Sequence, residues 1–155
     1  MLKRVAQAQQ RWGGANQSID NWLTARKNLL VEYCQLVGQK QSKPLDGAEQ
    51  IEAVQHFCHH LVDYVSTGHF GIFDQIIDDC QDYQRVDGYI SQLTASTDQV
   101  LDFYDRFNNV AEVSELNHFI AVLSSLGESL EQRFSIEDKL LGELYQHTVD
   151  EQSPA

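Results

Sequence analysis

Histidine and acidic side chains occur at the spacing of helical metal ligands in two parts of this 155-residue chain. His56 and His60 are four residues apart, as are His59 and Asp63, and residues 115–118 form one ExxH motif. Helical bundles that carry ExxH motifs and inward-facing glutamates bind a pair of iron ions. The pattern therefore raises the hypothesis of a metal-dependent, di-iron-like bundle. Its candidate ligands are His56, His59, Asp63 and His118.

Two features of the spacing weigh against a metal centre. A di-iron bundle needs two ExxH motifs and two further inward glutamates, whereas Glu115 and His118 supply the only ExxH motif here. Successive residues on a helix point about 100° apart, so His60 diverges from the His59 and Asp63 pair. We predict surface histidines, no metal and no cofactor, and elemental analysis for iron or zinc tests the alternative. No nucleophile arrangement or phosphate-binding glycine loop is recognisable, so we do not expect an enzyme.

Charged residues on otherwise apolar helix seams are the second chemical signal. A buried guanidinium without a carboxylate partner costs several kcal/mol, so such residues are expected to pair. The paired side chains either form an internal network that fixes the helix register or make the floor of a groove for a partner's helices. The two interpretations are compatible. The charged residues are Arg26, Asp63, Arg133 and Glu137, with Trp22 and Phe70 as apolar anchors of the groove.

Long amphipathic helices must position these side chains. Apolar residues recur every three or four positions, prolines are rare, and polar loops separate the periodic segments, so we predict an all-α fold. The expected architecture is an antiparallel up-and-down bundle of four main helices and a short N-terminal helix over residues 2–12. We expect a single domain over residues 1–149 and a frayed tail over 150–155. The predicted main helices cover residues 16–37, 47–80, 89–111 and 115–147.

The segment Phe57–Phe73 has two helical faces. One stripe is apolar and suits a core. The other, which continues from His56, is mostly polar and reaches Phe70 near Gly68, where we expect the helix to kink or to be interrupted. Because a helix needs only one face for the core, we interpret the second stripe as a candidate binding surface. Its members are His56, His59, Asp63, Ser66 and Phe70.

The charge distribution predicts a basic partner. The formal net charge is −12, yet residues 1–43 carry seven basic and two acidic residues, so the remainder is strongly acidic. An acidic body repels a phosphate backbone, so direct nucleic-acid binding is not expected. Cys34, Cys58 and Cys80 have no CxxC spacing. Without a signal peptide or a membrane span in the sequence, we predict a cytoplasmic protein.

Three collinear segments of the chain resemble the signature blocks of the Rsd/AlgQ family of bacterial anti-sigma proteins, the regulators of sigma D. The resemblance covers nearly the whole chain. The segments read WLTARKNLLVEYCQLVG from Trp22, FCHHLVDYVSTGHFGIF from Phe57, and LGESLEQRFSIEDKLL from Leu126.

The resemblance implies a helical bundle that binds the C-terminal domain (region 4) of the primary sigma factor. Covering this basic module would withhold sigma from core RNA polymerase and from the −35 element, and would favour alternative sigma factors in stationary phase. A monomer that forms a 1:1 complex is expected. Within the blocks, Asp63, Ser66 and Phe70 resemble the positions that line the family's binding cavity. Trp22, Arg26, Leu30, Arg133, Phe134 and Glu137 extend the predicted site.

Overall fold

The computed structural model of the chain describes residues 17–38, 47–74 and 83–152. All regular elements in these ranges are helical, which confirms the all-α prediction. The long helices are α2 (Gln17–Gly38), α3 (Gly47–Thr67), α5 (Tyr83–Phe107) and α6 (Phe119–Gln152). A π-helix, η1 (Gly68–Phe73), continues α3, and a 3₁₀ turn, η2 (Val113–Leu116), precedes α6.

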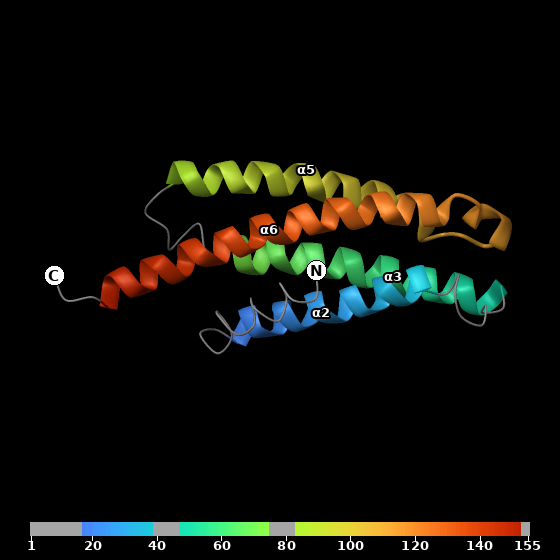
Figure 1. Cartoon of the computed structure of the whole chain (residues 1–155), viewed down its shortest axis with the longest axis horizontal. Helices are drawn as coiled ribbons and strands as arrows, with labels where there is room; N and C mark the ends of the chain where they lie inside the picture. The colour runs from blue at the N-terminus through green and yellow to red at the C-terminus, as the bar shows by residue number, and fades with distance from the viewer. Residues whose placement is uncertain (1–16, 39–46, 75–82, 153–155) are drawn as a thin grey trace.

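The four long helices lie side by side along the long axis of the molecule (Figure 1). In the same figure the colour gradient runs in opposite directions along α2 and α3, and again along α5 and α6. Helix α2 packs on α3, α3 on α5, and α5 on α6. Helix α6 continues to Gln152, beyond the expected end at residue 147. The expected short helix at residues 2–12 lies outside the described residues, and the domain boundary stays a prediction.

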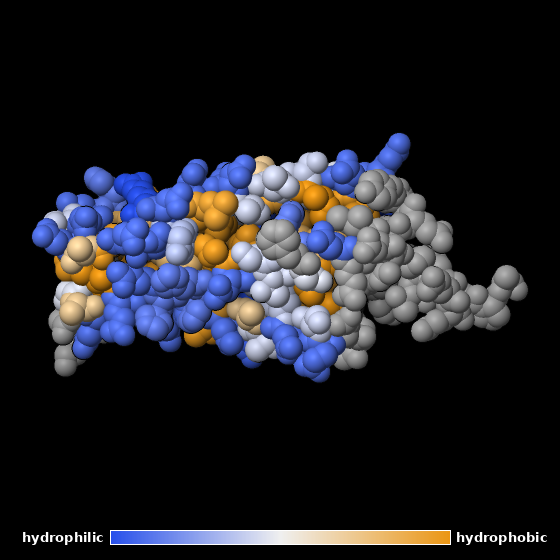
Figure 2. Space-filling view, turned by 180° about the vertical axis from the view of Figure 1, so that it is seen from behind, coloured by the Kyte–Doolittle hydropathy of each residue, from blue (hydrophilic) through white to orange (hydrophobic). Residues whose placement is uncertain are grey.

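The apolar stripes of the helices meet in one continuous core. Leu23, Val54, Leu61, Leu123 and Leu140 are completely buried within it. On the face shown in Figure 2, hydrophilic residues predominate, and hydrophobic residues reach the surface as patches between them. None of the helices, over the residues that the structure describes, has the length and apolar character that crossing a membrane requires.

The interruption predicted at Gly68 is confirmed, because α3 changes there from α-helix to π-helix. The Tyr64 carbonyl, which would accept the Gly68 amide in a regular α-helix, accepts the Trp22 indole N–H at 3.3 Å. A Cβ atom at position 68 would lie 3.0 Å from the Trp22 Nε1 atom. Glycine therefore lets the indole approach the helix at the point where the hydrogen-bond pattern changes.

The last long helix begins at Phe119 rather than at the expected residue 115. The preceding η2 turn is capped by Glu112, in a capping box with Glu115. The Glu115 carboxylate accepts the backbone amides of Ala111 and Glu112 at 2.8 and 2.9 Å. These backbone hydrogen bonds lower the pKa of Glu115 because they favour its charged form.

Gly127 marks a close approach of α2 to α6. The Tyr33 hydroxyl of α2 donates a hydrogen bond to the Leu123 carbonyl at 3.1 Å, directly beside Gly127. A Cβ atom at position 127 would lie 2.7 Å from the Tyr33 Cζ atom, closer than van der Waals contact allows. Because glycine has no side chain, the Tyr33 ring can lie against α6 at this position.

Gly127→Ala is expected to lower the free energy of unfolding by about 1–3 kcal/mol, because the clash with Tyr33 outweighs alanine's better helix propensity. Chemical denaturation measures the change. Gly88→Ala in α5 is the matched control: no atom lies within 4 Å of its Cβ position, so it is expected to stabilise by about 0.5–1 kcal/mol. A Gly127→Ala protein as stable as the parent would contradict the packing argument.

Candidate functional site

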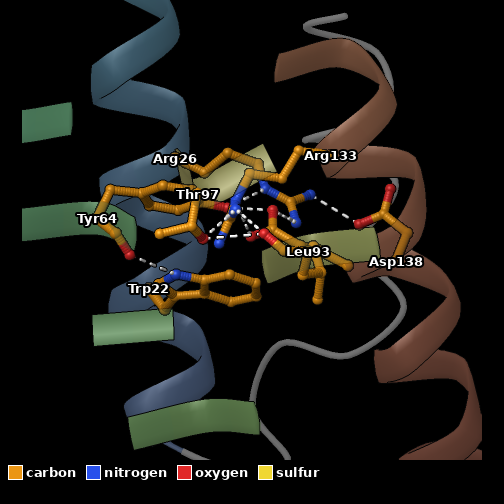
Figure 3. A network of polar contacts seen from close by, with 8 residues as sticks. Trp22, Arg26, Tyr64, Leu93, Thr97, Arg133 and Asp138 are labelled. Carbon is orange, nitrogen blue, oxygen red and sulfur yellow. Dashed lines mark hydrogen bonds and ion pairs between the residues drawn. The ribbon is translucent and has the colours of Figure 1, made fainter. Parts of the chain in front are cut away.

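Two arginines and a glutamate form a buried ion-pair network between the helices. Arg26, Arg133 and Glu137 each have an exposed fraction of 0%. The Arg26 Nη2 atom lies 3.1 Å from one Glu137 carboxylate oxygen, and the Arg133 Nε atom lies 3.2 Å from the other. Arg26 Nη1 also contacts the Asp138 carboxylate at 2.7 Å (Figure 3). Two cations and two anions therefore balance inside the bundle.

Neutral groups on α3 and α5 complete the network. The Tyr64 hydroxyl accepts from Arg26 Nε at 3.0 Å and donates to Glu137 at 2.5 Å. Arg133 Nη1 donates to the Leu93 carbonyl at 3.1 Å and to the Thr97 hydroxyl at 3.0 Å. The network thus joins α2, α3, α5 and α6, the four long helices. Asp63 was expected to belong to this network, but it is exposed. Tyr64 and Asp138 make the contacts to Arg26 instead.

The surroundings determine the ionisation states of Arg26 and Tyr64. Burial alone lowers the pKa of Arg26, but Tyr64, Glu137 and Asp138 outweigh this effect and raise it. Burial raises the pKa of Tyr64 well above its ordinary value, and the neighbouring Glu137 carboxylate adds to the rise. The arginine is therefore charged and the phenol neutral at physiological pH.

Aromatic rings enclose the Arg26 guanidinium. Its Cζ atom lies 5.1 Å from the Trp22 ring centroid and 4.9 Å from the Phe134 ring centroid. Trp22 stacks on Tyr64 with centroids 5.2 Å apart, and Phe134 meets Tyr64 edge-on. Cation–π contacts of a desolvated arginine are worth about 2 kcal/mol each. The charged network is therefore packed against buried aromatic rings.

A groove between α2 and α3 lies directly above these rings. Its volume is about 520 Å³. Trp22, Leu29 and Tyr64 form its floor, because they are buried, and Asp63 is exposed on its rim. The remaining lining residues are polar or small: Asn21, Ala25, Asn28, Glu32, His60 and Thr67. This groove is the candidate functional site, an aromatic floor with an acidic rim.

The structure separates the predicted site residues into two sets. Asp63 and Ser66 are exposed on α3, and Asp63 lines the groove. The Phe70 backbone lies in η1, but its side chain is outside the described part of the structure. The other six are buried and lie in the core or the network: Trp22, Arg26, Leu30, Arg133, Phe134 and Glu137. Their role in partner binding stays a prediction.

Three residues of the site were not predicted from the sequence. Tyr64 and Asp138 belong to the network, and Glu32 lines the groove. Tyr64 follows Phe57 and Leu61 on the core stripe of α3, so the helical period identifies it as buried. A tyrosine hydroxyl in a core needs a hydrogen-bond partner, so a tyrosine on the core stripe indicates a polar contact inside the bundle. No comparable signal marks Glu32, because its position depends on how α2 and α3 pack.

The histidines of α3 have separate neighbours. The His60 Nδ1 atom lies 2.5 Å from the Glu32 carboxylate, His56 lies 3.7 Å from Glu52, and the His59 ring packs against Tyr104. In the described ranges, no three histidine, cysteine, aspartate or glutamate side chains are grouped as metal ligands. The alternative of a metal-dependent bundle therefore has no support in this geometry.

The fold and the site define a helical bundle with an acid-rimmed, aromatic groove on its surface. The chain belongs to the Rsd/AlgQ family, described as "Regulator of RNA polymerase sigma(70) subunit, Rsd/AlgQ", which matches residues 1–145. A protein of Yersinia enterocolitica named "Regulator of sigma D" is 39% identical over 153 residues, covering 91% of this chain and 88% of the relative. The protein of that name in Enterobacter sp. is 40% identical over 145 residues, covering 91% and 88%.

Proposed function

We propose that this protein is an anti-sigma factor that binds region 4 of the primary sigma factor. The relatives at about 39–40% identity carry the name Regulator of sigma D, and the family is described as a regulator of the sigma(70) subunit of RNA polymerase. Sequestered region 4 is withheld from core RNA polymerase and from the −35 element. Alternative sigma factors then gain access to polymerase in stationary phase. This function implies a cytoplasmic location.

The observation that carries the proposal is the groove between α2 and α3. Region 4 is a basic helix-turn-helix module, and the groove offers an aromatic floor for an apolar anchor beside acidic side chains for lysine or arginine. The strong negative charge of the chain beyond residue 43 supports fast association with a basic partner.

The two sets of predicted site residues have different proposed roles. Asp63, Ser66 and Phe70 contact the partner directly at the groove and at the adjoining π-helix. Arg26, Arg133 and Glu137 are paired with one another and fully buried, so we assign them to the support of the groove from beneath. Trp22, Leu30 and Phe134 pack around that support.

Asp63→Ala is expected to weaken binding of purified region 4 about tenfold, because one carboxylate of the acidic rim is lost. Titration monitored by calorimetry measures the dissociation constant. Asp98→Ala removes the same charge from the exposed surface of α5, outside the groove, and is expected to leave affinity nearly unchanged. A folded Asp63→Ala protein with the parent's affinity would refute the site, and a parent that fails to bind region 4 would refute the function.

The proposed complex contains one copy of each protein, and the free chain is a monomer. Light scattering of the free chain and of an equimolar mixture gives both masses. Masses that correspond to a homodimer, in either sample, would contradict this stoichiometry.

A further inference from the structure

Glu32 and His60 are in hydrogen-bonding contact across the groove. Glu32 lies on α2 and His60 on α3, and the His60 Nδ1 atom is 2.5 Å from Glu32 Oε1. The side chains are 29% and 53% exposed, respectively, so the pair is accessible from the groove. Both residues line the groove that also contains Asp63.

The second carboxylate oxygen of Glu32 is the unusual feature of this pair. Glu32 Oε2 is buried, and no hydrogen bond reaches it from the residues that the structure describes. A buried carboxylate oxygen without a donor leaves the Glu32 charge incompletely compensated, so a cation beside this carboxylate is favourable. The neighbouring floor of Trp22 and Leu29 suits the aliphatic stem of a long cationic side chain.

We propose that Glu32 is a second acidic contact for the basic partner and that His60 competes with the partner's cation for it. This inference rests on the proposed function of the groove, whose predicted contacts do not include Glu32. An arginine or lysine of the partner lays its stem on the aromatic floor. Its charged end then donates to the Glu32 carboxylate in place of His60.

The competition depends on the charge of His60. Protonated His60 neutralises Glu32 and repels an incoming cation, whereas neutral His60 still donates a hydrogen bond and leaves the carboxylate charge in place. Affinity for a basic partner is therefore lower with a positive charge at position 60 than with a neutral hydrogen-bond donor there. The other titratable side chains lining the described groove are Asp63 and Tyr64, and His56 adjoins His60 on α3 at a ring distance of 6.2 Å.

Three variants separate the roles of Glu32 and His60 in binding titrations with purified region 4 at about pH 8 and about pH 6. Glu32→Gln is expected to weaken binding about tenfold at about pH 8. His60→Gln keeps a neutral donor, so it should bind about fivefold more tightly than the parent at about pH 6 and equally at about pH 8. His60→Lys carries a permanent charge and should bind weakly at both.

Glu52 supplies the matched control, because it lies beside a histidine, His56, on α3 but outside the groove. Glu52→Gln is expected to retain the parent's affinity and pH profile. If the parent and Asp63→Ala behave as proposed but Glu32→Gln binds like the parent, or His60→Gln keeps the parent's profile, this inference alone fails. If the parent does not bind region 4 at either pH, the proposed function fails and this inference with it.

Discussion

Glu137→Ala is expected to lower the free energy of unfolding by about 3–5 kcal/mol, the cost of breaking a fully buried ion pair. Glu137 accepts from Arg26, Tyr64 and Arg133, so the truncation leaves two buried guanidinium groups with one carboxylate between them. That remaining carboxylate, Asp138, is 20% exposed and reaches only Arg26 within the described network. Urea denaturation followed by circular dichroism measures the loss as a shift of the midpoint.

Glu143→Ala is the matched control for this prediction. Glu143 lies on the same helix and meets Arg85 at 3.1 Å, the distance that separates Glu137 from Arg26, but Arg85 is 60% exposed. Exposed pairs contribute about 0–1 kcal/mol, so the control is expected to change stability within that range. Equal losses for the two variants would contradict the argument that burial decides the effect.

A combined apolar replacement tests what the network contributes beyond stability. Substituting Arg26→Met, Arg133→Leu and Glu137→Leu together removes the charged side chains that are fully buried in the described part of the chain, and such replacements are often neutral or stabilising. The buried Arg133 Nη2 atom makes no hydrogen bond to the described residues. Removing it is therefore expected to add to the stability of the triple variant. A stable triple variant that no longer binds region 4 would assign the network to the positioning of the groove. A triple variant as unstable as Glu137→Ala would show that the charges themselves stabilise the bundle.

The helices and their buried faces were predictable because both follow from the periodicity of residues that are close together in the sequence. The stripe containing Ile19, Trp22 and Leu30 defines the buried face of α2, and the structure buries all three. The interruption at Gly68 was also predictable, because a glycine stands within an apolar period there, but the π-helix that forms it was not. Helix ends were less well defined: α5 begins at Tyr83 rather than at residue 89, because acidic residues obscure the period there.

The candidate site was only partly predictable because its contacts are not local. Periodicity placed Arg26, Arg133 and Glu137 on core faces, and the structure buries each of them. Periodicity did not indicate which residue of α3 contacts these buried charges. Asp63 and Tyr64 differ by one position, or about 100° of helix rotation, and Tyr64 is the one that is buried, whereas Asp63 is exposed. Charge alone favoured the aspartate, whereas the core stripe of α3 required the tyrosine.

Trp22→Ala is expected to lower the free energy of unfolding by about 3–5 kcal/mol, as for other buried aromatic truncations. The indole is 1% exposed and stacks on Tyr64 with an interplanar angle of 3°. It also meets Phe73 of the π-helix edge-on, with centroids 5.7 Å apart. The truncation therefore leaves a cavity beneath the groove and removes the indole hydrogen bond to the Tyr64 carbonyl.

Trp22→Phe separates these two effects. It keeps an aromatic ring against Tyr64 but loses the N–H donor, so a loss of about 1–2 kcal/mol is expected from the unpaired carbonyl and the smaller ring. Val31→Ala lies on the same helix at a side chain that is 42% exposed, and it should change stability by less than about 0.5 kcal/mol. A Trp22→Ala protein within about 1 kcal/mol of the parent would contradict the packing described for α2.

The same tryptophan links stability to recognition, because it belongs to the core and to the floor of the groove. Hydrogen exchange in the Trp22→Phe protein is expected to rise first in η1, where the indole bond to Tyr64 coincides with the change from α-helix to π-helix. Region 4 binding by folded Trp22→Phe should weaken along with this local opening. If exchange in η1 stays at the parent's level while binding falls, the indole acts only as a contact surface. If both change together, its hydrogen bond positions the end of α3 beside Asp63.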